Sequence, residues 1–132
     1  MLLAACSSAP VVPPIDSAAR EQQALGAIES GDLLAARSIY QELVQRTIGD
    51  ERSRFQIALA QTDIELGDPE GALALLAAIN PPLSPALESA LTAARASALF
   101  ALGQTVEAVR LLIEREIWLE SSGEILDNQA RI

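Results

Sequence analysis

Small and apolar residues recur along the chain at a fixed interval of 36 positions from residue 16 onward. Three glycines mark the period, because Gly31, Gly67 and Gly103 are each 36 residues apart. The repeated apolar columns are Ala24, Ala60 and Ala96; Ile28, Ile64 and Phe100; Ala36, Ala72 and Ala108; Ile39, Leu75 and Leu111; and Tyr40, Leu76 and Leu112. Each unit therefore predicts a helix, a short glycine turn and a second helix, with the alanine columns letting paired helices approach closely.

Residues with strong local preferences mark where these helices begin and end. A glycine after the first helix of a unit supplies the positive φ that the turn requires. Asp32 and Asp68 follow two of these glycines and are suited to cap the next helix. Pro69 and Pro85 fit the first position of a helix, and Pro81-Pro82 interrupts the chain between two of the predicted helices.

The composition also favours an all-α fold. The chain of 132 residues suits one domain, and its 24 Ala and 20 Leu make up a third of it, whereas aromatic residues make up only 3%. Alanine and leucine favour helices over sheets, which are usually rich in β-branched and aromatic residues. We therefore expect helices that pack through small side chains.

Charge and residue content exclude several functions. The chain has 18 acidic and nine basic residues, a net charge of −9, so it repels phosphate and is not expected to bind nucleic acid. With no His and one Cys it cannot form a Cys/His zinc site or a His-activated nucleophile, and it lacks a glycine-rich phosphate loop. We expect no enzyme, no catalytic residue, no metal and no cofactor. A carboxylate-based glycan hydrolase would need a close acidic pair, and no such pair stands out.

The amino terminus carries the most specific short motif. Residues 3–6 read Leu-Ala-Ala-Cys and resemble the bacterial lipobox, in which the cysteine receives the lipid anchor. Residues 1–5 would then be the remnant of a lipoprotein signal peptide, and the Ser- and Pro-rich residues 6–15 a flexible tether. Cys6 is the predicted lipidation site, and Ser7 after it resembles the pattern that sorts lipoproteins to the outer membrane.

The repeat resembles the tetratricopeptide family, most closely in residues 31–40, Gly-Asp-Leu-Leu-Ala-Ala-Arg-Ser-Ile-Tyr. This resemblance implies an all-α, TPR-like helical-hairpin solenoid with three repeats of 36 residues. The first helix of each repeat would line a concave groove. The polar or aromatic candidates for this groove are Glu21, Glu29, Arg54, Gln61, Glu65, Ser97 and Phe100. They do not resemble the basic, Asn-rich clamp that holds peptide carboxylates, so that subtype of receptor is disfavoured.

The order of segments resembles LpoA-type penicillin-binding-protein activators. In that family a lipobox and a tether lead into Gly-Asp repeats and then into Arg-Glu and Asn-Gln segments, here within residues 111–120 and 127–132. The resemblance implies a TPR-like domain over residues 16–132, on the periplasmic side of the outer membrane, followed by a missing C-terminal domain. That missing domain would contact a bifunctional penicillin-binding protein. Peptidoglycan or other envelope proteins are further partners that this resemblance suggests.

A free-standing TPR-like adaptor is the alternative. It would hold a peptide or protein in the concave face, and binding would weaken on charge reversal of Arg54 or Glu65 but not on Cys6→Ser. Tyr40, Phe100 and Trp118 are interpreted as core or interdomain residues. A last helix is expected to begin near Ser122 or Gly123.

Overall fold

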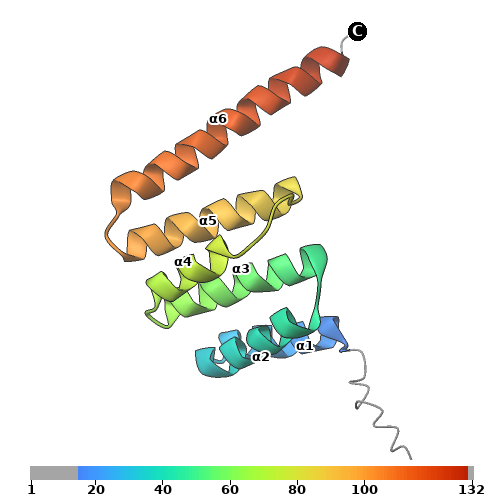
Figure 1. Cartoon of the computed structure of the whole chain (residues 1–132), viewed down its shortest axis with the longest axis vertical. Helices are drawn as coiled ribbons and strands as arrows, with labels where there is room; N and C mark the ends of the chain where they lie inside the picture. Colours follow the sequence, from blue (N-terminus) through green and yellow to red (C-terminus); the bar gives the residue numbers. More distant parts are fainter. Residues whose placement is uncertain (1–14, 131–132) are drawn as a thin grey trace, which may run out of the picture.

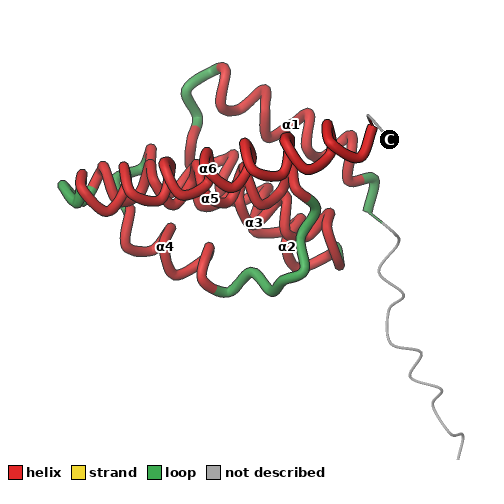
Figure 2. The backbone as a smooth tube through the Cα atoms, turned by 90° about the horizontal axis from the view of Figure 1, so that it is seen from above, coloured by secondary structure: helices red, strands yellow, loops and turns green. Residues whose placement is uncertain are grey.

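The structure, a computed structural model, describes the backbone of residues 15–130 and the side chains of residues 15–117. The predicted lipid site at Cys6, most of the predicted tether and the side chain of Trp118 lie outside this part. Six helices form within it, and Figure 2 shows only helices and loops. They are α1 (Ser17–Glu29), α2 (Leu33–Arg46), α3 (Gly49–Glu65), α4 (Pro69–Ala77), α5 (Pro85–Ala101) and α6 (Thr105–Ala130). The all-α prediction is confirmed.

The helices pair into three hairpins, α1 with α2, α3 with α4 and α5 with α6, which stack in chain order (Figure 1). Helix α3 packs against α2 of the preceding hairpin, and α5 packs against both α3 and α4. Of the described helices, only α5 packs against α6. None of them is both long and apolar enough to cross a membrane.

The three glycine turns have the same geometry. Gly31, Gly67 and Gly103 have φ values of 80°, 88° and 77°, a region that side chains with a Cβ rarely adopt. Each turn closes with two backbone hydrogen bonds. In the first turn, the N–H of Asp32 donates to the carbonyl of Ala27 at 2.8 Å and the N–H of Gly31 to that of Ile28 at 3.0 Å. The same pair of bonds recurs one period and two periods later. All three turns therefore have the same length, and the repeats align without insertions or deletions at the turns.

The predicted caps form. The carboxylate of Asp32 accepts from the N–H of Ala35 at 3.1 Å, and that of Asp68 accepts from the N–H of Gly71 at 2.9 Å. Ser84 likewise caps α5, which begins at Pro85. These side chains satisfy backbone donors that the first turn of a helix leaves without a partner.

The alanine columns lie at the centre of each hairpin. The six residues are at most 2% exposed: Ala24, Ala36, Ala60, Ala72, Ala96 and Ala108. Tyr40 is a core residue as predicted, with its ring centroid 6.4 Å from that of Phe55 on α3. Helix pairs can approach closely only where side chains are this small, so the columns fix the spacing within each hairpin.

Two expectations are wrong. Phe100 is 44% exposed and is not a core residue, because no further helix of the described chain covers this side of the last hairpin. No helix begins near Ser122 or Gly123, since α6 runs unbroken through both residues. One glycine in a helix costs only about 1 kcal/mol relative to alanine, and no proline is present there to stop the helix.

Candidate functional site

A hollow of about 300 Å³ lies between α3 and α5, the first helices of the second and third hairpins. It is lined by Gln61, Ile64, Glu65 and Ser97. Three of the seven predicted groove residues, Gln61, Glu65 and Ser97, therefore come together. Gln61 and Glu65 are one helical turn apart on α3, and Ser97 stands one repeat period after Gln61, so the 36-residue register brings them to the same surface.

The lining of this hollow is polar with one apolar wall. It offers an amide, a carboxylate and a hydroxyl beside the partly buried Ile64. Glu65 is exposed, and among the described residues it has no ion-pair partner. A carboxylate placed in this way can accept hydrogen bonds from a basic or amide group of a bound segment.

Glu21 and Arg54 do not take part in this hollow, because they pair with each other. Nη1 of Arg54 lies 2.7 Å from Oε1 and 2.8 Å from Oε2 of Glu21, which joins α1 to α3. The guanidinium of Arg54 also lies over the ring of Phe55, 4.6 Å from its centroid. Burial raises the pKa of the nearby Tyr40. The charge of Glu21 raises this pKa further, whereas the charge of Arg54 lowers it. This pair stabilises the junction between two hairpins more than it offers charge to a ligand.

The remaining two candidates lie apart from the hollow. Glu29 is exposed at the carboxyl end of α1, and Phe100 is exposed near the carboxyl end of α5. Neither lines the hollow between α3 and α5.

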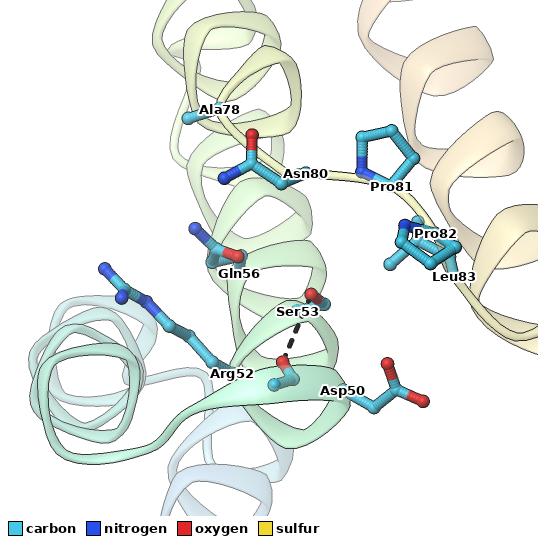
Figure 3. Close-up of a pocket in the computed structure, with 10 residues that line it drawn as sticks. Asp50, Arg52, Ser53, Gln56, Ala78, Asn80, Pro81, Pro82 and Leu83 are labelled. Carbon is cyan, nitrogen blue, oxygen red and sulfur yellow. Dashed lines mark hydrogen bonds between the residues drawn. The ribbon is translucent and has the colours of Figure 1, made fainter.

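The sequence did not indicate a second hollow, of about 360 Å³, where the first turns of α3 face the loop between α4 and α5 (Figure 3). Its only signal was the Pro81-Pro82 break. In Figure 3 the side chains of Asp50 and Arg52 point in different directions, so they do not form a paired site. The hydroxyl of Ser53 donates to the carbonyl of Gly49 at 3.3 Å and is thus already engaged.

The sequence analysis also did not single out one buried carboxyl group. Asp63 on α3 is 4% exposed, and its Oδ1 lies 2.8 Å from Nε of Arg37 on α2. Burial raises the pKa of Asp63 although Arg37 opposes this effect. Within the described residues no group of three or more potential metal-ligating side chains occurs. The pair of Arg37 and Asp63 joins α2 to α3, and neither of its residues lines either of the two hollows.

Comparison with known proteins agrees with this architecture. The tetratrico peptide repeat family matches residues 18–116, which begin in α1 and end within α6, so all three hairpins take part in the match. No curated protein and no solved structure gives a match. The matched segment, the three identical glycine turns and the buried alanine columns place the chain in the tetratricopeptide repeat family.

Proposed function

We propose that this chain is the non-catalytic amino-terminal scaffold of an outer-membrane lipoprotein that activates a bifunctional penicillin-binding protein in peptidoglycan synthesis. Tetratricopeptide repeats are generally protein–protein interaction scaffolds without catalytic activity. The finer assignment is supported by the order of elements along the chain, with the lipobox-like Cys6, the Ser- and Pro-rich residues and then the repeats.

The repeats suit a spacer. Each hairpin shares a hydrophobic core with the next, one around Phe55 and a second around Leu76, so continuous packing joins the three hairpins. An acyl anchor on Cys6 and the tether would hold this stack on the periplasmic side of the outer membrane. A further domain of the same protein would then contact the synthase, and the stack would set its distance from the anchor.

Replacement of Cys6 in the native bacterium tests this proposal. Cys6→Ser removes the thiol that carries the lipid, so we expect the protein to leave the outer-membrane fraction and the incorporation of labelled cell-wall precursors to fall. Ser8→Ala is the matched control, because it changes a neighbouring residue and leaves the thiol in place. Retention of the Cys6→Ser protein in the outer membrane would contradict the anchor. Unchanged incorporation after release from the membrane would contradict the activator role.

The hollow between α3 and α5 favours a second candidate, a protein-binding adaptor. Its carboxylate at Glu65 has no ion-pair partner among the described side chains, and Ile64 supplies an apolar wall, which together suit a basic and apolar protein segment. Charge reversal at Glu65 is the cleaner test, because reversal at Arg54 would also break its pair with Glu21. For an adaptor, Glu65→Arg weakens binding of an Arg- or Lys-containing probe peptide, whereas Cys6→Ser leaves it unchanged. Unchanged peptide binding by Glu65→Arg, together with weakened binding by Cys6→Ser, would contradict the adaptor.

A further inference from the structure

The two boundaries between hairpins differ in how their helices meet. At the second boundary, α5 packs against both helices of the preceding hairpin, α3 and α4. At the first boundary, α3 packs against α2, and among the described helices α1 packs against α2 alone. Two lines of contact fix the angle between the second and third hairpins. A single line of contact leaves the first hairpin able to turn about it.

The repeat register shows what replaces the missing contact at the first boundary. Glu21 of α1 and Arg54 of α3 correspond, one period later, to Ile57 of α3 and Ala90 of α5. Ile57 is 4% exposed and belongs to the core against which Ala90 packs, and the small alanine lets α5 approach α3. Arg54 instead reaches Glu21 through its long side chain, at 2.7 Å. This ion pair, here called the bridging pair, stands where the second boundary has apolar packing.

The second ion pair of the first boundary has a different setting. Arg37 of α2 and Asp63 of α3 correspond to Leu73 and Leu99 one period later, so this pair also replaces apolar residues. The carboxylate of Asp63 is buried, and the pair lies along the contact of α2 with α3, about which the first hairpin would turn. The two side chains of the bridging pair are 50% and 23% exposed. The bridging pair is therefore the one that salt in the solvent screens more strongly.

We infer that the first boundary is a hinge whose angle the Glu21–Arg54 pair holds, so that ionic strength sets the orientation of the first hairpin relative to the other two. The first hairpin turns about the core that α2 and α3 share around Phe55, and the bridging pair keeps α1 near α3 while it forms. Exposed ion pairs are weak, and the Debye length falls from about 30 Å at 0.01 M salt to about 3 Å at 1 M. The hinge does not depend on the lipid anchor or on the hollow at Glu65, so it stands or falls separately from the proposed function.

Distances between spin labels across each boundary test this inference. The labels are placed in the whole 132-residue protein with Cys6→Ser, so that only introduced cysteines react. One label pair is at Gln22 of α1 and Ala74 of α4, and the other is at Ala74 and Val106 of α6. All three positions are exposed. Each label pair spans about two helix spacings, roughly 20 Å, a distance that double electron–electron resonance measures.

Salt should change only the distance across the first boundary. Between about 0.02 M and about 1 M NaCl, we expect the mean distance from Gln22 to Ala74 to shift by at least about 2 Å, whereas the distance from Ala74 to Val106 stays unchanged. Repulsion between acidic hairpins acts at both boundaries, so the second label pair accounts for it. Glu21→Gln should produce the same shift at low salt, because it removes the charge and retains the size of the side chain.

Two further variants make the result specific. Glu51→Gln removes an exposed carboxylate of α3 that takes part in no ion pair among the described residues, so it should leave both distances unchanged. Exchange of the two charges, Glu21→Arg with Arg54→Glu, should restore the low-salt distance. This exchange keeps the test valid if circular dichroism shows that Glu21→Gln impairs folding. A first distance that neither salt nor Glu21→Gln changes would overturn the inference, and so would an equal shift of both distances.

Discussion

Nε of Arg37 on α2 lies 2.8 Å from Oδ1 of Asp63 on α3, so an ion pair crosses the boundary between the first two hairpins. The carboxylate end is buried, whereas the arginine side chain remains 41% exposed. Burial disfavours the charged form of Asp63 more than Arg37 favours it, and the pKa is raised above its ordinary value of 3.8. The pair therefore joins the two hairpins, and the free-energy cost of burying the charged carboxylate of Asp63 varies with pH.

This carboxyl predicts a pH effect on stability. Because the folded chain holds the proton of Asp63 more tightly than the unfolded chain, its contribution is fully present below pH 3.8 and is lost as the pH rises through the folded pKa. Asp63→Asn should remove this pH-dependent contribution to stability. We expect the free energy of unfolding in urea, measured from pH 3.5 to 7, to fall less with rising pH in the variant than in the parent. Asp50→Asn, an exposed control, should follow the parent, and identical profiles for all three proteins would refute the assignment.

The contribution of Glu42 to the free energy of unfolding should change with pH in the opposite direction. Its pKa is lowered, chiefly by the hydrogen bond from Arg20, whose Nη2 lies 2.8 Å from Oε2. The stability from this group is present above its ordinary pKa of 4.5 and is lost as the pH falls through the lower folded pKa. The carboxylate is 34% exposed, so solvent screening limits the effect of Glu42→Gln to less than about 1 kcal/mol at pH 7. Chemical unfolding of the variant at pH 7 and pH 3 measures this, and an equal loss at both pH values would argue against the ion pair.

The glycine turns predict a pair of substitutions with opposite effects. Gly67 has a φ of 88°, so Gly67→Ala forces a Cβ into the left-handed region and should cost about 1–2 kcal/mol. Gly26 lies inside α1 with nothing within 4 Å of an added Cβ. Gly26→Ala should therefore stabilise the chain by about 0.4–1 kcal/mol. Thermal unfolding distinguishes the two, and a shift of the same sign in both variants would contradict the turn geometry.

The alanine columns predict intolerance of larger side chains. Ala60 is 0% exposed where α3 meets its neighbours, so Ala60→Leu overpacks the core and should cost about 1–3 kcal/mol or more. Ala74 on α4 is exposed, and Ala74→Leu should change stability by no more than about 0.5 kcal/mol. Urea midpoints of both variants check this. Equal tolerance of leucine at both positions would mean that the column does not set the helix spacing.

The repeat period predicted most of the fold, because it depends on local features that a sequence displays directly. The turns at Gly31, Gly67 and Gly103, the caps at Asp32 and Asp68, and the burial of the alanine columns all follow from positive φ, capping chemistry and side-chain size. The exposure of Phe100 could not be predicted in this way. It depends on what covers the last hairpin, whereas its column partners Ile28 and Ile64 are partly buried.

The candidate site was predicted only in part. Gln61, Glu65 and Ser97 line one hollow, because residues one period apart lie on equivalent helix faces, and whether this hollow binds a ligand stays a prediction. The register did not reveal that Glu21 and Arg54 neutralise each other, since pairing depends on side-chain reach between helices. Asp63 was missed for a similar reason. A buried polar residue interrupts an apolar pattern in the same way that an exposed one does, so only the contact with Arg37 identifies it.

The mass of the amino-terminal tryptic fragment of the protein purified from its native envelope tests the central proposal most directly. For a lipoprotein scaffold, cleavage before Cys6 removes residues 1–5, and lipid is added to the thiol and the new amino group of Cys6. We expect the fragment that ends at Arg20 after trypsin digestion to begin at Cys6 and to carry the added mass of the acyl groups. An unmodified fragment that still begins at Met1, from a chain of 13.9 kDa, would contradict the lipoprotein assignment.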